Sequence, residues 1–194
     1  MDALRFLYRF IRNPKQIGSL IPSGKGLCRS LVMTAGVPQA STIVEFGTGS
    51  GVVTELIEKE RSINSNFFGI ELDEDLFNIT KNRCPNSDII HGSAIKTKEY
   101  LQERGLIGCN CIVSGLPWAN FPEQLQTELF DAILESLLPG GRFVTFSYIQ
   151  STLMPNYRRF RKRVDKTFDQ TGDEPWVWSN FPPARVYWGQ KKKS

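Results

Sequence analysis

The chain has 194 residues, 40% of them apolar, with 24 Lys and Arg against 20 Asp and Glu, for a net charge of +4. This length suits one well-buried domain, and no segment reaches the roughly 18 to 20 apolar residues that a membrane span needs. The net charge is low for a protein that binds a nucleic-acid backbone. Four cysteines and one histidine show no metal-ligand spacing, so we expect no metal site and reduced thiols.

Residues 2–12 are predicted to form a short basic amphipathic helix. At about 100° per residue its arginines fall on one side and its apolar residues on the other. This pattern is typical of an interfacial membrane anchor, and an apolar face that docks on the domain explains it equally well. The arginines also interrupt the apolar core that a secretory signal needs. The residues expected to face the membrane are Arg5, Phe6, Arg9, Phe10 and Arg12.

A loop rich in Pro and Gly follows over residues 13–24, and a second helix is expected from Lys25 to Ala35. The first predicted strand, Ile43–Phe46, ends in a turn with glycines at positions 47, 49 and 51, and a helical pattern begins at Val52. This G-x-G-x-G spacing differs from the G-x-G-x-x-G of dinucleotide enzymes and from a P-loop, because no Gly-Lys-Ser/Thr follows.

An acidic residue beside this turn would repel a pyrophosphate but suits a ligand that carries an ammonium and a sulfonium. S-Adenosylmethionine is such a ligand. A second apolar run, residues 67–70, ends in Glu71, where a nucleoside-binding α/β protein places the carboxylate that accepts ribose hydroxyls. We therefore predict S-adenosylmethionine as the cofactor, bound by Glu45, Gly47, Thr48, Gly49, Gly51 and Glu71.

Helices and strands continue to alternate after Glu71. We expect helices over residues 74–82, 98–104 and 123–138, strands over 88–90, 109–113 and 142–148, and a turn at 139–141. A basic helix over 155–164 precedes extended segments at 167–168 and 176–178 and a last strand at 184–188. The pattern predicts an α/β fold that is Rossmann-like, with a mostly parallel seven-stranded sheet, a C-terminal antiparallel hairpin and helices on both faces.

Ligands of such sheets lie beyond the carboxyl ends of the strands. The adenine is expected between Leu72 and the Ser93-Ala94 turn, and Ser114 with the turn after it would border the transferable methyl. The hydroxyls of Ser114 and Tyr148 are our candidate catalytic groups, because they could orient the lone pair of an amine acceptor. Ser114 is equally explained as polar lining, and Tyr148 as a buried strand residue.

Several segments together resemble one enzyme family, the soluble bacterial phospholipid N-methyltransferases, which are relatives of the rRNA adenine dimethylases. The segments are Phe10 and Pro14, residues 17–23 (IGSLIPS), 45–51 (EFGTGSG), 114–117 (SGLP), 146–148 (FSY) and 180–187 (NFPPARVY). The resemblance implies a class I methyltransferase that converts phosphatidylethanolamine to phosphatidylcholine by three S-adenosylmethionine-dependent methylations.

The resemblance also implies how the chain is organised. Residues 1–35 would form a helix, loop and helix that cover the site, and residues 36–194 would form the methyltransferase domain. Two positions depart from the family's pattern. Ser93 replaces the usual Asp at the adenine, which would weaken cofactor binding, and Trp118 replaces a smaller aliphatic residue, which bears on acceptor size.

The lipid assignment predicts a monomer that is cytoplasmic and peripheral on the inner face of the membrane. The N-terminal helix, the arginines of residues 158–163 and the lysines at 191–193 suit an anionic bilayer, and Trp176, Trp178 and Trp188 suit its interface. Arg185 would meet the lipid phosphate or form a surface ion pair. The expected substrate contacts are Ser23, Leu116, Pro117, Trp118 and Arg185.

Two other functions fit part of the pattern. A nucleic-acid adenine methyltransferase would need an aromatic platform after the fourth strand to stack a flipped base, and Trp118 offers one. The turn there is Ser-Gly-Leu-Pro rather than the acidic or Asn-containing sequence expected for that class. A non-catalytic S-adenosylmethionine-binding protein is the second alternative, and Ser93 is the residue that favours it.

Overall fold

The computed structural model describes residues 24–193 of the chain. The predicted N-terminal helix, with Arg5, Phe6, Arg9, Phe10 and Arg12, and the substrate candidate Ser23 lie outside the described residues. Within residues 24–193, no helix is both long and apolar enough to cross a bilayer. No cluster of His, Cys, Asp and Glu that could hold a metal ion occurs in the same range.

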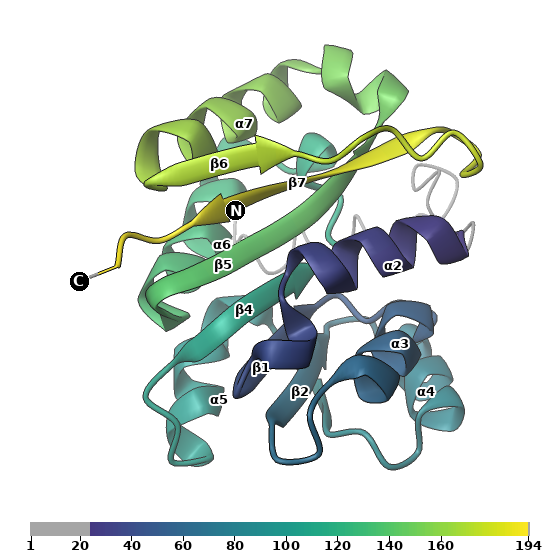
Figure 1. The fold of residues 1–194 in the computed structure, drawn as a ribbon, viewed down its shortest axis with the longest axis vertical. Helices are drawn as coiled ribbons and strands as arrows, with labels where there is room; N and C mark the ends of the chain where they lie inside the picture. Colours follow the sequence, from purple (N-terminus) through teal and green to yellow (C-terminus); the bar gives the residue numbers. More distant parts are fainter. Residues whose placement is uncertain (1–23, 194) are drawn as a thin grey trace.

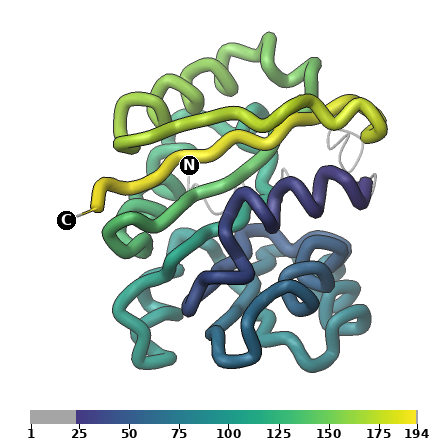
Figure 2. The backbone as a smooth tube through the Cα atoms, viewed as in Figure 1, coloured from purple at the N-terminus to yellow at the C-terminus, as the bar shows by residue number. Residues whose placement is uncertain are grey.

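Seven strands form one sheet in the order β3-β2-β1-β4-β5-β7-β6. The pairs from β3 to β5 are parallel, and β7 runs antiparallel between β5 and β6, as the tube in Figure 2 shows. The strands are β1 (Thr42–Phe46), β2 (Asn66–Glu71), β3 (Ile89–His91), β4 (Cys109–Ser114), β5 (Leu137–Tyr148), β6 (Gln170–Asp173) and β7 (Ala184–Gln190). The predicted mostly parallel sheet with a C-terminal antiparallel hairpin is confirmed.

Helices cover both faces of the sheet (Figure 1). Residues of α2 and α3 pack in one apolar cluster, and residues of α5, α6 and α7 pack in the other. The helices are α2 (Lys25–Thr34), α3 (Val52–Glu60), α4 (Glu74–Arg83), α5 (Thr97–Glu103), α6 (Glu123–Ser136) and α7 (Pro155–Thr167), with the 3-10 turns η1 (Val37–Gln39), η2 (Ala94–Lys96), η3 (Trp118–Asn120) and η4 (Ile149–Leu153).

β1 is the strand that positions the site. All five of its residues are buried, because a central parallel strand has apolar neighbours on both faces. β1 pairs with β2 on one side and with β4 on the other, so the chain changes direction across the sheet between β1 and β4. Crevices at such switch points are where open α/β sheets bind ligands.

One predicted detail of the last strands is wrong, and one strand was not predicted. The predicted turn at residues 139–141 lies within β5, where the β4 pairing shifts register and Gly140 has a φ of 76°. The predicted extended segment at 176–178 contributes the bridge from Val177 to Ala184, and β6, which was not predicted, pairs with the free edge of β7.

Trp118 belongs to the core rather than to an exposed platform. Its ring stacks on Phe160 with centroids 4.1 Å apart and meets Phe121 and Phe143 edge-on, and the residue is only 2% exposed. Its indole Nε1 donates to Ser114 Oγ at 3.1 Å. The prediction that Trp118 could stack a flipped base is therefore wrong, because no open face of the ring is left for one.

Replacement of Trp118 by Ala should lower the free energy of unfolding by about 3 to 5 kcal/mol, because it leaves a cavity among three aromatic rings. Urea unfolding followed by far-UV circular dichroism measures this change. The matched control is Trp178→Ala, at a residue that is 68% exposed, and it should change stability by no more than about 0.5 kcal/mol. Equal losses in the two variants would contradict the assignment of Trp118 to the core.

Candidate active site

The turn after β1 uses three glycines at alternate positions, and all three have left-handed backbone angles. Gly47, Gly49 and Gly51 have φ values of 73°, 57° and 77°, a region that side chains other than glycine's enter only with strain. A Cβ on Gly47 would lie 2.8 Å from Leu116 Cδ2, whereas a Cβ on Gly49 would meet nothing within 4 Å. The turn is thus packed at its first glycine and open at its second.

Glu71 and Thr80 hold the open part of the turn. The backbone N–H of Gly49 donates to Glu71 Oε2 at 2.8 Å, and the Thr80 hydroxyl donates to the Gly49 carbonyl at 2.8 Å. The other oxygen of Glu71 accepts from the N–H groups of Leu72 and Asp73. A carboxylate has about four acceptor positions, so Glu71 retains capacity for a ligand hydroxyl beside the turn.

Glu45 is buried below the turn. It is 1% exposed, and its Oε2 accepts a hydrogen bond of 2.7 Å from the Thr54 hydroxyl, in the first turn of α3. Burial raises the pKa of Glu45 from 4.5 to about 8, against the hydrogen bond from Thr54, which lowers it. A buried carboxyl of this kind is mostly protonated at neutral pH and would ionise next to a cation.

The predicted adenine position lies at the ends of β2 and β3. Ser93 is 5% exposed and Ala94 7% exposed, and Leu72 packs against the same apolar cluster as Ala94. Ser93 Oγ caps η2 by accepting from Ile95 N at 3.4 Å. A hydroxyl that accepts in this way still has its proton to donate, so Ser93 could offer a hydrogen bond to a ligand at this position.

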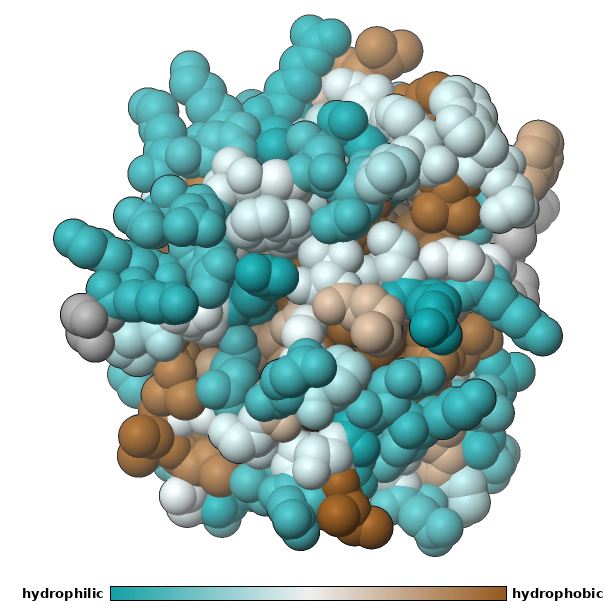
Figure 3. All heavy atoms as spheres, in the orientation of Figure 1, coloured by the Kyte–Doolittle hydropathy of each residue, from teal (hydrophilic) through white to brown (hydrophobic). Residues whose placement is uncertain are grey.

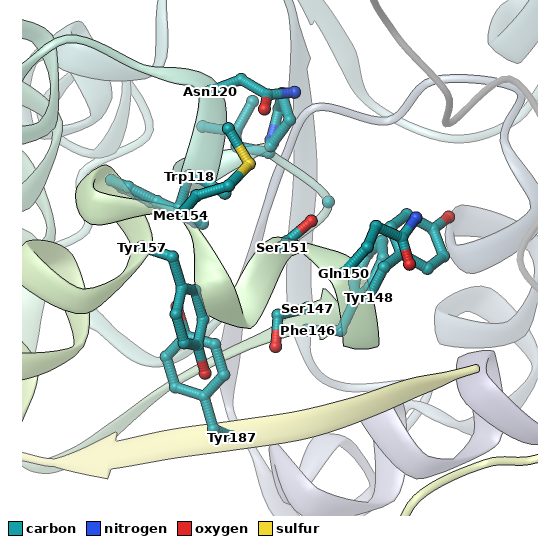
Figure 4. Close-up of a pocket in the computed structure, with 14 residues that line it drawn as sticks. Trp118, Asn120, Phe146, Ser147, Tyr148, Gln150, Ser151, Met154, Tyr157 and Tyr187 are labelled. Carbon is teal, nitrogen blue, oxygen red and sulfur yellow. The ribbon is translucent and has the colours of Figure 1, made fainter. Parts of the chain in front are cut away.

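A cavity of about 200 Å³ lies at the carboxyl ends of β4 and β5 (Figure 4). Its wall brings together four predicted site residues: Leu116, Pro117, Trp118 and Tyr148. The remaining described lining residues are Gly115, Ala119, Asn120, Phe146, Ser147, Gln150, Ser151, Met154, Tyr157 and Tyr187.

Leu116 joins this cavity to the glycine turn. Its side chain lines the cavity and also contacts Gly47, and the neighbouring Gly115 N–H donates to the Phe46 carbonyl at 2.8 Å. The two loops that follow β1 and β4 are therefore packed against each other. A cofactor on the glycine turn would have the cavity beside it, on the far side of Leu116.

Ser114 and Tyr148, the two predicted catalytic residues, occupy different positions. Ser114 is fully buried, and its hydroxyl oxygen accepts from Trp118 Nε1 and from Leu116 N at 3.1 and 3.3 Å. The Ser114 hydroxyl thus holds the turn of residues 114–118 in place. Tyr148 is half-buried on the cavity wall and meets Phe146 edge-on at 5.4 Å, and burial raises its pKa.

Arg185 lies on β7, opposite Ser147 of β5. Its guanidinium stands 5.0 Å from the centre of the Trp176 ring, and its Nε is 3.6 Å from Asp173 Oδ1. Asp173 is already held at both carboxylate oxygens by Arg161. Arg185 Nε is buried without a hydrogen-bond partner, so this arginine is only loosely paired next to the cavity wall.

Among the cavity residues that were not predicted as site residues, three carry buried hydroxyl groups: Ser147, Tyr157 and Tyr187. They lie on β5, α7 and β7, and no short motif joins them. Successive side chains of β7 point to opposite faces of the sheet, and this was the only signal in the sequence for Tyr187. Ala184 and Val186 pack in the same apolar cluster as α2. Tyr187 therefore lies on the other face, together with Arg185.

The comparisons with known proteins agree on the fold. No family model matches the chain. Among solved structures, an O-methyltransferase from Bacillus cereus in complex with S-adenosylhomocysteine has a TM-score of 0.68 at 14% identity and covers 98% of this chain and 92% of its own. The O-methyltransferase TomG from Streptomyces achromogenes, in complex with S-adenosylmethionine, has a TM-score of 0.68 at 15% identity, with 98% and 90% covered.

A further structure, the N-methyltransferase NodS from Bradyrhizobium japonicum, has a TM-score of 0.64 at 10% identity and covers 86% of this chain and 94% of its own. One curated relative is much closer in sequence. The ornithine lipid N-methyltransferase of Singulisphaera acidiphila is 30% identical over 189 residues, which are 96% of this chain and 94% of the relative. The chain therefore belongs to the same family as this lipid N-methyltransferase and is a class I S-adenosylmethionine-dependent methyltransferase.

Proposed function

We propose that the protein methylates the amine of a membrane lipid, with phosphatidylethanolamine and its mono- and dimethylated forms as acceptors. The observation that carries this proposal is the cavity beside the glycine turn, whose wall continues into exposed apolar residues. Gln150, Ser151 and Met154 line the cavity, and their neighbours Ile149 and Leu153 are 39% and 71% exposed. Such a rim suits an acceptor whose tails stay in a bilayer.

The cofactor would be held by the residues around the glycine turn. We assign the ribose hydroxyls to Glu71, the adenine to the slot of Leu72, Ser93 and Ala94, and the ammonium end to the neighbourhood of Glu45. Bound S-adenosylmethionine would supply the methyl group: the amine lone pair would form the N–CH₃ bond, the electrons of the broken S–CH₃ bond would stay on sulfur, and the new charge would rest on nitrogen. Before another transfer, the nitrogen would lose a proton to solvent.

The protein's part in this chemistry is alignment and exclusion of water. Leu116 and Pro117 separate the cavity from the glycine turn and would set the distance between acceptor and donor. Tyr148 would close the wall at the end of β5. Ser114 would fix the turn through its bonds with Trp118 and Leu116 rather than contact the amine itself.

A membrane-facing edge is part of the proposal. Single apolar residues appear among paler ones at the upper right of the space-filling view (Figure 3). The exposed apolar residues of η4 are Ile149 and Leu153, and the loop before β7 adds Trp178 and Phe181, 68% and 83% exposed. The exposed Arg158 and Arg159 of α7 would attract anionic lipid head groups. With the N-terminal helix of Arg5, Phe6, Arg9, Phe10 and Arg12 as an anchor, the protein would act as a monomer on the inner face of the cytoplasmic membrane.

The relative favours a second acceptor. Its name specifies an ornithine lipid, which also presents a primary amine at a membrane surface. The same cavity could take either head group. Arg185 would contact a lipid phosphate only with phosphatidylethanolamine, because ornithine lipid has no phosphate. Nucleic acid is the weaker choice because the buried Trp118 offers no surface on which to stack a base.

The wild-type chain should transfer labelled methyl groups from S-adenosylmethionine to phosphatidylethanolamine in mixed anionic vesicles. Glu71→Ala and Gly49→Asp should each lower transfer at least about 100-fold, since one removes the proposed ribose acceptor and the other crowds the open part of the turn. Lipid mass spectrometry measures the mono-, di- and trimethylated products, with parallel vesicles that contain ornithine lipid.

The control for Glu71→Ala is Glu74→Ala, which removes an exposed acid from the first turn of α4 and should preserve transfer. If labelled methyl appears in ornithine lipid alone, the acceptor is ornithine lipid rather than phosphatidylethanolamine. Transfer to neither lipid, by a chain that binds S-adenosylmethionine, would contradict the proposed function.

Cofactor binding should release a proton from Glu45 below pH 8. The free carboxyl has a pKa of about 8 and is mostly protonated below that value, and a cationic ligand lowers the pKa by favouring the carboxylate. The affinity therefore rises as the pH approaches 8 from below and levels off above it. Calorimetry in buffers of different ionisation enthalpy counts the protons that are released.

Glu45→Gln is the matched control for this titration, because the ionisation of the cofactor's own amine is common to both proteins. The variant should release less proton than the wild type at pH 7 and show a flatter dependence of affinity on pH. Identical proton release in the two proteins would show that Glu45 does not sense the bound cofactor.

A further inference from the structure

Three residues of the cavity wall carry hydroxyl groups that are buried without a hydrogen-bond partner: Ser147 Oγ, Tyr157 Oη and Tyr187 Oη. The three residues are 5%, 5% and 0% exposed, and all of them line the cavity. They come from β5, α7 and β7. Figure 4 shows the two tyrosines side by side on one wall and Ser147 between them and Tyr148.

A buried hydroxyl without a partner costs about 1 to 3 kcal/mol, so three of them around one cavity call for a ligand. Across residues 24–193, the other unpartnered buried side-chain atoms are Gln126 Oε1, Ser136 Oγ and Arg185 Nε. Of these six atoms, the three on cavity-lining residues are all hydroxyl oxygens. Hydroxyl oxygens can accept hydrogen bonds from an amine.

The charge of the wall favours a neutral amine. The described lining residues include no carboxylate, lysine, arginine or histidine. A carboxylate would hold an amine as its ammonium, whereas an apolar wall with neutral oxygens favours the uncharged form. Burial raises the pKa of Tyr187 well above its ordinary value, so this phenol stays neutral as well. The rings of Tyr157 and Tyr187 stand perpendicular, with centroids 6.0 Å apart, and give a methylated amine aromatic surface to contact.

We propose that Ser147, Tyr157 and Tyr187 bind the acceptor amine in its neutral form through N–H···O hydrogen bonds and so orient its lone pair toward the methyl donor. This inference rests on the proposed function, which it deepens by naming the residues that recognise the amine. Each methyl group that is added removes one N–H donor. A primary amine has two such donors, a secondary amine one and a tertiary amine none, so the hydroxyls act most strongly on the first transfer.

The test compares primary and N,N-dimethylated phosphatidylethanolamine as acceptors for Ser147→Ala, Tyr157→Phe and Tyr187→Phe. At least two of the three variants should lose about tenfold in kcat/KM with the primary amine, because its two N–H groups can donate to two of the three hydroxyls. A tenfold loss is the equivalent of one hydrogen bond of about 1.4 kcal/mol. With the dimethylated lipid each variant should lose less than about threefold. Because only the first methylation is slowed, the variants should leave more unmethylated lipid, while the lipid that does react is still carried on to the trimethylated product. Equal losses with both acceptors, or no loss with the primary amine, would overturn the proposal.

Thermal unfolding separates recognition from a loss of structure. Removal of an unpartnered buried hydroxyl is neutral or stabilising, so the three variants should unfold at or above the wild-type temperature. The matched control is Ser136→Ala, which removes a buried unpartnered hydroxyl from the end of α6, outside the cavity. This control should keep wild-type kcat/KM with both acceptors.

A binding measurement tests the amine site even if no lipid is methylated. The chain is loaded with S-adenosylhomocysteine and titrated with short-chain lipids that carry either an ethanolamine or a choline head group. The hydroxyl variants should bind the ethanolamine lipid several-fold more weakly than the wild type and the choline lipid equally well. Unchanged binding of the ethanolamine lipid would overturn the amine site, whereas an inactive wild type with intact selective binding would overturn only the proposed function.

Discussion

The site depends on a backbone turn that glycine alone can form without strain. Gly47, Gly49 and Gly51 all have positive φ angles, and the turn is held open by Glu71 from β2 and Thr80 from α4. These two partners come from the strand and helix that follow the turn in the chain. The conformation that a cofactor would meet is therefore fixed by β2 and α4 together with the turn itself, before any ligand arrives.

A second constraint joins the core to the acceptor cavity. Ser114 ends β4 and accepts a hydrogen bond from Trp118, whose ring stacks on Phe160 of α7. The turn between Ser114 and Trp118 lies between this anchored indole and Gly47, which leaves no room beside Leu116. The large residue at position 118 thus fills the core and also lines the cavity.

Much of the cofactor side could be predicted from the sequence, because its signals are local. The acid, the glycines and the following helix lie within one short segment, and Glu71 ends the next strand. The acceptor side could not be predicted in the same way. Ser147, Tyr157 and Tyr187 lie on β5, α7 and β7, three elements that are brought together only by the folded sheet and the helix packed on it. β6 itself was missed because its sequence, QTGD, is polar and lies at the sheet edge.

For Ser114, the position in the strand could be predicted from the sequence, whereas the hydrogen-bond partner of its hydroxyl could not. Its place at the end of β4 was predictable, but the Trp118 indole that occupies its hydroxyl is brought there by packing against α7. Sequence spacing gives a residue's position along a strand, whereas the partner of its side chain depends on the tertiary core. Functional groups on separate elements become visible only once the elements are packed.

The central claim is that the glycine turn and the hydroxyl-lined cavity are two halves of one site that meet at Leu116. A crystal structure of the full chain with S-adenosylhomocysteine and a short-chain ethanolamine lipid tests it most directly. We expect the ribose on Glu71, the sulfur facing the cavity past Leu116, and the amine within hydrogen-bond distance of Ser147, Tyr157 or Tyr187. A head group bound outside the cavity, or a sulfur that faces away from it, would contradict the account.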